Sequence, residues 1–476
     1  MSFNSIAFAM FLPVVFLIYW SIPRKYQWVL LLIASYYFYM SWNAKYVFLI
    51  LFTTIVSYCC GLFMSGAKSA GHKKVILGCA AGICLGVLFL FKYFNFFSVV
   101  FCDAARMFAI NLHPVTLNLL LPVGISFYTF QTLSYVIDVY HGRVQPERHF
   151  GKYAVFVSFF PQLVAGPIER TDNLLPQIRQ EHRFQYEDAV NGLRQMLWGF
   201  FKKVVIADTL ANYADMVFND PYSYRGGVLL IAALFFSIQI YCDFSGYSDI
   251  AIGTARLFGI RLMTNFTSPY LSASVNEFWR NWHISLSSWF RDYVYIPLGG
   301  NRRGAFRRYV NVMITFLLSG LWHGASGTFV FWGGLHGLAQ VVENIFGWNK
   351  KKKHRVISAC IVFVFVTFAW IFFRAGTMQE AAHVIRYMFS GISAPVTYAR
   401  EALAAVGLDR KECLGIGFSL LVLFGFDFIS LKKDPLQEIL KFPGVVRWGI
   451  YYVTGILLIV YALQNAGANQ FVYFQF

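Results

Sequence analysis

The chain has little charge for its length. Only 13% of its 476 residues are Asp, Glu, Lys or Arg, and acidic residues are scarce, at 23 against 40 basic ones. A soluble domain carries roughly 25% charged residues, because these keep its surface in water. With 58% hydrophobic residues and a mean hydropathy of +0.54, the composition excludes a soluble enzyme, a disordered chain and a coiled coil. It predicts a protein that lies in lipid.

Cysteine frameworks and a cleavable leader are missing as well. The eight cysteines form no C-x-x-C pair and most lie in apolar runs, so we expect small buried hydrophobic side chains and no zinc site or disulfide framework. Residues 3–22 are apolar but lack a preceding basic region and a small-residue cleavage site. They are therefore predicted to form a retained first membrane span.

Long uncharged runs are the main feature that the sequence does contain. A helix that crosses a bilayer needs roughly 17–25 mostly apolar residues, whereas a barrel would show short alternating strands. We therefore predict an all-α polytopic membrane protein with roughly 10–12 transmembrane helices. Nine stretches of 17 or more residues contain no Lys, Arg, Asp or Glu: 1–23, 26–44, 46–67, 75–91, 107–137, 226–242, 309–342, 356–373 and 448–476.

No internal repeat or linker divides the chain, so a single membrane domain over residues 1–476 is expected. Within it we distinguish peripheral N-terminal spans at 1–101, a core at 118–345 and C-terminal spans at 356–476. Only the core carries polar residues in a pattern that suggests chemistry.

Three segments of this core depart from plain membrane spans. Small and polar residues recur in 118–140, which predicts a central helix packed on protein more than on lipid. Two prolines and a glycine in FFPQLVAGPIER, residues 159–170, are expected to break any straight helix. Residues 189–206 are predicted to form an amphipathic interfacial or short buried helix with three cations at its polar edge. These cations are Arg194, Lys202 and Lys203.

The net charge of +17 comes mainly from basic residues in short loops. This is the pattern of the positive-inside rule, not of one basic face that binds nucleic acid, so no nucleic-acid partner is expected. With the loop at 24–25 in the cytoplasm, the N-terminus is predicted to be extracytoplasmic. The loop cations are Arg24, Lys25, Lys68, Lys73, Lys74, Arg302, Arg303, Arg307, Arg308, Lys350–Lys353 and Arg355.

Two polar islands interrupt the apolar segments of the core. The first, QIYCDFSGYSDIAIG at 239–253, holds Asp243 and Asp249. An intramembrane carboxylate is costly and so suggests a functional site, although pairing with basic neighbours to hold helices together is an equal alternative. The second, 276–303, is predicted to be one helical segment that places Trp279, His283 and Ser287 on one face. We interpret this face as part of a functional site, because a simple interfacial helix has no need for His283 among its tryptophans. The alternative is an interfacial helix with an aromatic belt.

A third island lies in the longest uncharged run and contains LSGLWHGASGTFVFWGGLHG. Its two histidines are His323 and His336. The surrounding glycines leave room for close approach of a ligand, and a neutral histidine can accept a proton. His323 is therefore predicted to be a buried general base, while His336 fits helix packing equally well.

These islands carry a resemblance to a known family. VGISFYTFQTLSYVIDVY, FFPQLVAGPIER, YCDFSGYSDIAIGTARLFG, NEFWRNWHISLSSWFRDYVYIPLGGNRRG, GLWHGASGTFVFWGGLHG and the ending FVYFQF follow one another in order. Together they resemble the membrane-bound O-acyltransferase family, and within it the bacterial alginate O-acetyltransferase (AlgI-like) group. The resemblance covers essentially the whole chain.

The resemblance implies a fold, a reaction and a site. Helices would ring a central funnel or tunnel in the bacterial cytoplasmic membrane, with an acetyl thioester such as acetyl-CoA entering from the cytoplasm. The family's essential histidine matches His323, and its second position matches His283. No bound cofactor or metal is expected. Residues expected to bind substrate or support the site are Asp243, Ser245, Asp249, Glu277, Trp279, Arg280, Asn281, Trp282, Arg291, Asp292 and Trp322.

Three functions remain open at this level. In the favoured one, His323 deprotonates an acceptor hydroxyl or assists transfer through an intermediate, and His283 orients or polarises the thioester carbonyl. The acetyl group then goes to an extracytoplasmic polysaccharide, directly or through a secreted SGNH-type acetyltransferase. D-alanyl transfer from a carrier protein to teichoic acids is a second function. A proton-coupled transporter is a third, although transporters of this size tend to contain repeats.

Overall fold

A computed structural model describes residues 1–348, 354–464 and 471–472. These residues are helical or irregular and include no β-strand, which confirms the all-α prediction. Among the described residues, six helical segments are long and apolar enough to cross a membrane: Ala44–Gly66, Ala70–Arg106, Gly227–Leu257, Arg355–Arg374, Arg410–Ser430 and Gly444–Gln464. The expected 10–12 spans stay a prediction. The basic loop at Lys350–Lys353 and most of the FVYFQF ending lie outside the described residues.

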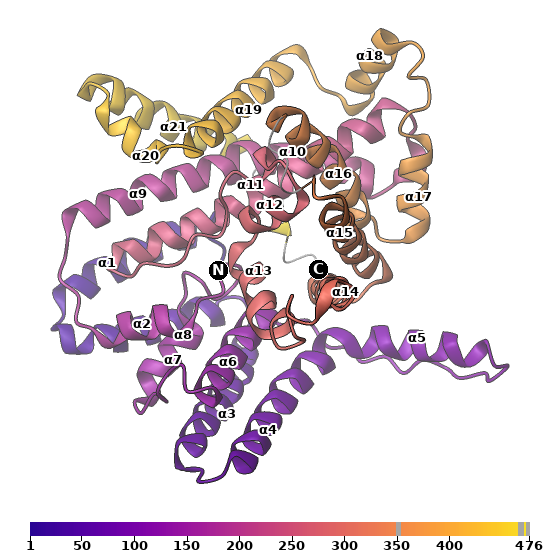
Figure 1. Cartoon of the computed structure of the whole chain (residues 1–476). Coiled ribbons are helices and arrows are strands. Elements are labelled where there is room, and N and C mark those ends of the chain that lie inside the picture. The colour runs from indigo at the N-terminus through magenta and orange to yellow at the C-terminus, as the bar shows by residue number, and fades with distance from the viewer. Residues whose placement is uncertain (349–353, 465–470, 473–476) are drawn as a thin grey trace. The chain divides into compact units, whose positions relative to one another are not determined.

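The chain divides into two compact units. Unit 1 comprises residues 1–193 and 251–263, and unit 2 comprises 194–250 and 264–476. All eight cysteines lie in the described residues and are free thiols. Unit 1 holds the following helices (Figure 1): α1 Ile6–Ser21, α2 Gln27–Met40, α3 Val47–Gly66, α4 Ala70–Leu88, α5 Phe94–Arg106, α6 Ile125–Tyr140, α7 Phe150–Ser158, α8 Thr171–Arg179 and the first half of α9, Tyr186–Phe200.

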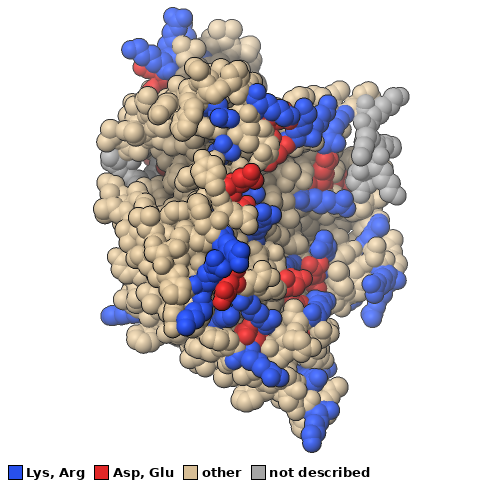
Figure 2. All heavy atoms as spheres, turned by 90° about the vertical axis from the view of Figure 1, so that its left-hand side faces the viewer, with Lys and Arg blue, Asp and Glu red and all other residues tan. Residues whose placement is uncertain are grey.

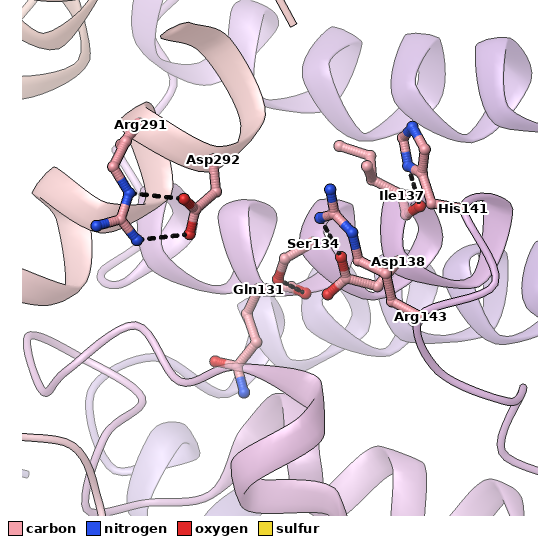
Figure 3. A network of polar contacts seen from close by, with 8 residues as sticks. All are labelled: Gln131, Ser134, Ile137, Asp138, His141, Arg143, Arg291 and Asp292. Carbon is pink, nitrogen blue, oxygen red and sulfur yellow. Dashed lines mark hydrogen bonds and ion pairs between the residues drawn. The ribbon is translucent and has the colours of Figure 1, made fainter. Parts of the chain in front are cut away.

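Helix α6 forms the core of unit 1, as its small and polar residues predict. Every residue from 125 to 136 is buried, and α3, α4 and α7 pack against the helix. Its polar side chains bond within the protein: Gln131 Nε2 donates to the carbonyl of Phe156 at 2.6 Å. Figure 3 shows the Ser134 hydroxyl on the Gln131 carbonyl and the ion pair of Asp138 with Arg143, 3.0 Å apart. The uncharged stretch 107–137 is helical only in this second half, since residues 110–122 are irregular.

The Pro-Gly segment at 159–170 breaks the helix as predicted. Helix α7 ends at Ser158, and α8 begins at Thr171. The break buries the Glu169 carboxylate completely. One carboxylate oxygen accepts the backbone N–H of Met263 at 2.5 Å and the other accepts Asn173 Nδ2 at 2.6 Å. The irregular backbone is thus held by a buried acid whose two oxygens are both bonded.

Glu169 makes the stability of the protein depend on pH. Burial raises the pKa of Glu169 from 4.5 to about 7, against smaller lowering effects of its hydrogen bonds. The unfolded chain releases this proton at a lower pH than the folded chain does, so the contribution of Glu169 to the free energy of unfolding is full below the unfolded pKa. This contribution, roughly 2–3 kcal/mol, is lost as the pH rises through about 7. Thermal unfolding is measured at about pH 5 and pH 8, and the difference in stability between the two should be smaller in Glu169→Gln than in the wild type. Equal differences would contradict a role of Glu169 in this pH dependence.

Unit 2 holds the remaining helices (Figure 1). These are the second half of α9, the π-helical turn η4 Phe201–Ala207, α10 Asp208–Phe218, η5 Pro221–Ser223, α11 Gly227–Leu257 up to residue 250, η6 Pro269–Leu271, α12 Val275–Asn281, α13 Ile284–Phe290, the π-helical turn η7 Arg291–Tyr295, α14 Gly304–His323, α15 Gly327–Phe346, α16 Arg355–Arg374, α17 Met378–Tyr387, α18 Pro395–Val406, α19 Arg410–Ser430, α20 Pro435–Glu438, η9 Ile439–Lys441 and α21 Gly444–Gln464. The uncharged run 309–342 therefore forms a helical hairpin and not one span.

Two of the cations in 189–206 do not lie at a polar edge. Lys202 and Lys203 are buried, at 4% and 1% exposed. They belong to the π-helical turn η4, a geometry that often occurs at functional sites. Gly199 lets this region approach α11, since a Cβ there would lie 2.7 Å from the carbonyl oxygen of Gly246. Close approach brings the two lysines to the carboxylates of α11, so the amphipathic interpretation was wrong for them.

Candidate active site

The structure brings the two candidate histidines together in unit 2. His323 is the last residue of α14, and His283 lies between α12 and α13. Their ring centroids are 6.4 Å apart, with the ring planes inclined by 61°. His283 is fully buried and His323 is 4% exposed. Two imidazoles at this distance in a buried site are placed to act on one reacting group.

A break in the helix positions His283. Helix α12 ends at Asn281 and α13 starts at Ile284, and His283 between them has a left-handed backbone, with φ +46°. The prediction of one continuous helix that places Trp279, His283 and Ser287 on one face is therefore wrong. A left-handed residue turns the chain out of the helical path. The Ile284 N–H bonds to the Asn265 carbonyl at 2.9 Å and does not continue the hydrogen bonding of α12.

Asn265 determines the tautomer of His283. Its side-chain oxygen Oδ1 accepts the backbone N–H of Ser285 at 3.1 Å and the Ser285 hydroxyl at 2.9 Å. Its Nδ2 donates to the hydroxyl of Ser248 at 3.3 Å. The atom 3.2 Å from His283 Nδ1 is thus an acceptor, so Nδ1 carries the hydrogen and donates. In the neutral ring, the lone pair is then on Nε2.

Burial also controls the charge of His283. Desolvation lowers the pKa of His283 well below its ordinary value of 6.5. The ring of Phe244 packs edge-on against it, with centroids 4.6 Å apart. The imidazole is therefore neutral at physiological pH, and its Nε2 accepts a hydrogen bond or a proton.

Aromatic rings enclose His323. Trp322, Trp332 and Phe373 have ring centroids 5.0, 5.1 and 5.4 Å from the His323 ring. This wall depends on close packing of α14 against α15, which run side by side (Figure 1). A Cβ on Gly320 would lie 2.3 Å from the carbonyl oxygen of Phe329. At Gly320 the missing side chain thus allows two helices to pack closely, whereas the sequence predicted room for a ligand.

His336 is a packing residue of this aromatic cluster. It is fully buried, and its Nδ1 accepts a hydrogen bond from Trp279 Nε1 at 3.1 Å. Trp332 contacts both histidines of the hairpin: its ring centroid is 5.0 Å from that of His336 and 5.1 Å from that of His323. Trp279 and His336 thus tie α12 to α15.

The carboxylates of the first island form buried ion pairs. Lys203 Nζ lies 2.5 Å from Asp243 and 2.8 Å from Asp208. Lys202 Nζ lies 2.6 Å from Asp249 and donates to the Ser245 hydroxyl at 2.9 Å. The structure thus shows the pairing that the sequence left open. Asp243, Ser245 and Asp249 contact the two lysines, and a role in binding substrate stays a prediction.

Most charged residues of the second island pair away from the histidines. Glu277 accepts the N–H of Ala273 at 3.0 Å and pairs with Arg355 at 2.6 Å. Arg291 and Asp292 pair with each other at 2.8 Å (Figure 3).

The other predicted supporting residues divide by exposure. Arg280 is exposed, while Asn281 donates to the Ser272 hydroxyl at 3.1 Å. Trp282 is fully buried and packs on Trp370, with centroids 5.1 Å apart. Trp322 contacts the rings of both histidines. Its centroid is 5.0 Å from that of His323 and 6.1 Å from that of His283.

Sequence reasoning missed several residues around the histidines: Asn265, Ser248, Ser285, Phe244, Trp332 and Phe373. Asn265 was detectable as an amide among apolar residues in LMTNFTSPY. The aromatic residues have no such signal, because this chain contains 51 Phe and 12 Trp. Within the described ranges no three His, Cys, Asp or Glu side chains gather as a metal site would require.

Replacing Asn265 should disturb His283 through its tautomer. Asn265→Ala removes the acceptor of the Nδ1 hydrogen and leaves the Ser285 N–H without its partner, so we expect acyl transfer to fall about tenfold or more. The matched control is Asn344→Ala, since Asn344 Nδ2 donates one turn back within α15, to the Gln340 carbonyl at 2.8 Å. Equal activity of the two variants at equal protein levels would contradict this role.

Comparison with known proteins decides the family. The model of the MBOAT, membrane-bound O-acyltransferase family, matches residues 147–378. A probable alginate O-acetylase AlgI of Pseudomonas aeruginosa is 42% identical over 445 residues, which are 92% of this chain and 83% of that protein. The chain belongs to the membrane-bound O-acyltransferase family.

Two further relatives place this acyltransferase more closely. A peptidoglycan O-acetyltransferase of Helicobacter pylori is 37% identical, over 80% of this chain and 79% of its own length. A teichoic acid D-alanyltransferase of Bacillus subtilis is 28% identical, over 54% of this chain and 69% of its own length. The acyltransferase is thus more similar to O-acetylating relatives than to this D-alanylating one. The matched segment includes both His283 and His323.

Proposed function

We propose that this protein transfers an acetyl group from a cytoplasmic thioester, acetyl-CoA, toward hydroxyls of an extracytoplasmic polysaccharide. The observation that carries the proposal is the pair of buried histidines, 6.4 Å apart between ring centroids, in a chain of this family. Buried imidazoles are suited to accept a proton from a hydroxyl near neutral pH.

The tautomer of His283 assigns its part in the reaction. His283 donates from Nδ1 to Asn265 and holds its lone pair on Nε2, so the neutral ring accepts a hydrogen bond on that side. It therefore orients the acceptor through a hydroxyl other than the one that reacts, because the proton of the reacting hydroxyl passes to His323. Both roles predicted for His283 concern the thioester, and a hydrogen bond that polarises the thioester carbonyl would need an N–H on Nε2. We propose orientation of the acceptor instead.

His323 acts as the general base. The hydroxyl oxygen attacks the thioester carbonyl carbon and its proton passes to His323, while the C–O bond forms. The C–S bond then breaks, and the thiolate that leaves takes the proton back from the imidazolium. Trp322, Trp332 and Phe373 around the ring exclude water, which would otherwise hydrolyse the thioester.

Basic side chains support an anionic donor such as CoA. Figure 2 shows Lys and Arg in groups on one face of the molecule, with Asp and Glu among them. A pocket of about 520 Å³ in unit 1 is lined by Arg24, His182 and Arg183 together with Trp20 and Phe184. Clustered cations raise the local concentration of a polyanion.

The relatives support a cell-envelope glycan as acceptor. Two of them are named for O-acetylation of alginate and of peptidoglycan. Both are polysaccharides outside the cytoplasm, so the acetyl group must cross the membrane plane. We propose that it reaches the glycan directly or through a secreted acetyltransferase, and that the chain lies in the cytoplasmic membrane with an extracytoplasmic N-terminus.

Deletion of the gene tests this function. Ester-linked acetate and ester-linked D-alanine are released by mild base from each purified envelope glycan and quantified in the deletion strain and the complemented strain. Loss of acetate from one glycan, restored by the wild-type gene, is the expected result. Loss of D-alanine esters instead would replace the proposal by D-alanyl transfer, and unchanged levels of both would refute acyl transfer to a glycan.

A further inference from the structure

A short buried segment of unit 2 contacts helix α11 beside the site. Phe471 and Val472 are 2% and 3% exposed. The backbone N–H of Val472 donates to Asp243 Oδ2 at 2.8 Å. The Phe471 ring packs edge-on against Tyr247, with centroids 4.5 Å apart, and lies 4.2 Å from Lys203 Nζ. The segment is thus tied to α11 by both its backbone and its side chain.

This contact completes the buried ion network. Asp243 Oδ1 pairs with Lys203 at 2.5 Å, which leaves Oδ2 for the Val472 N–H. A hydrogen bond from a backbone N–H to a carboxylate is strong in a buried environment. If this bond were absent, Oδ2 of Asp243 would lose its donor in a residue that is only 2% exposed. Hydrophobic packing of Phe471 would not need a charged partner. The bond from the Val472 N–H to Asp243 is therefore the contact that links the segment to the ion network.

The same turn of α11 reaches the histidine. Phe244 follows Asp243 directly, and its ring lies 4.6 Å from the His283 ring at 88°. Phe266 supports this ring from another side, with centroids 5.0 Å apart. The segment holds Asp243 and Tyr247, and these flank Phe244 on one turn. Movement of this turn would therefore shift the surface against which His283 packs.

We propose that the Phe471–Val472 segment is a positioning element of the acetyl-transfer site. It fixes the turn of α11 from Asp243 to Tyr247, and through Phe244 it fixes the ring of His283. The inference rests on the proposed function of His283 in orienting the acceptor. It does not make Val472 a catalytic residue, since the segment acts through α11.

A pair of variants at one position tests the backbone bond. Val472→Pro removes the N–H, whereas Val472→Ala keeps it and loses two methyl groups. With acetyl-CoA as the probe in isolated membranes, kcat of the proline variant should be about tenfold below that of the alanine variant, with similar KM values. Equal kcat values, or a loss confined to KM, would overturn the positioning role.

A labelling measurement tests the docking without relying on activity or on the proline variant. Val472→Cys in the full-length protein in membranes is treated with N-ethylmaleimide, and labelling of residue 472 is followed by mass spectrometry. The labelling rate of each variant is divided by the rate of the same variant denatured in detergent. This normalised rate should be at least about tenfold lower for Val472→Cys than for Val396→Cys, because Val396 is 81% exposed. Equal rates would overturn the proposal. Protection of residue 472 in a protein that transfers no acetyl group would instead refute the proposed function and leave the docking standing.

Discussion

Replacing His323 by alanine is expected to abolish O-acetylation while the protein remains inserted and folded. The variant removes the general base of the proposed reaction, and such acid–base help contributes about 10²–10⁴-fold in rate. Acetate esters of the target glycan should therefore fall to the level of the deletion strain. The measurement is base-released acetate per glycan in cells complemented with the variant, at protein levels matched by immunoblotting.

The same helical hairpin offers a control for this variant. His336 is also a fully buried histidine near Trp332, and it bonds to Trp279. His336→Gln keeps a polar side chain there, so it should retain most of the acetylation. Full acetylation in His323→Ala cells would refute the assignment of the base. Equal loss in both variants would assign the effect to packing of the aromatic cluster.

Replacing Lys203 by methionine is expected to have the largest effect on stability. Lys203 is 1% exposed and lies between Asp208 and Asp243, at 2.8 and 2.5 Å. The variant leaves two buried carboxylates without their cation. Removal of one partner from a buried ion pair costs about 3–5 kcal/mol, because the remaining charge is no longer compensated. The melting temperature of the purified protein should therefore fall markedly.

A surface ion pair in the same unit is the matched control. Lys441 Nζ lies 2.7 Å from Glu438, but the lysine side chain is 66% exposed. Water solvates the Glu438 carboxylate that remains after the substitution, so Lys441→Met should change stability far less than Lys203→Met does. Similar melting temperatures for Lys203→Met and Lys441→Met would show that the buried network does not stabilise the fold. A double variant, Lys203→Met with Asp208→Asn, should recover part of the loss, since it removes one uncompensated charge.

Local patterns predicted the class of the protein and many of its helices. Uncharged runs indicated membrane helices, and the small and polar residues of α6 indicated its buried position. The prolines and glycine at 159–170 located the break between α7 and α8. These features depend on residues close together in the chain, so composition and periodicity are sufficient to detect them.

The sequence by itself determined an all-helical membrane acyltransferase with His283 and His323 as its candidate pair. Only the tertiary structure decided that their rings lie 6.4 Å apart, that a left-handed residue carries His283, and that Asn265 selects its tautomer. It likewise decided that Lys202 and Lys203 are buried partners of Asp249 and Asp243, not edge cations. The reason is physical: helical periodicity is a local property, whereas burial and pairing depend on segments brought together by packing.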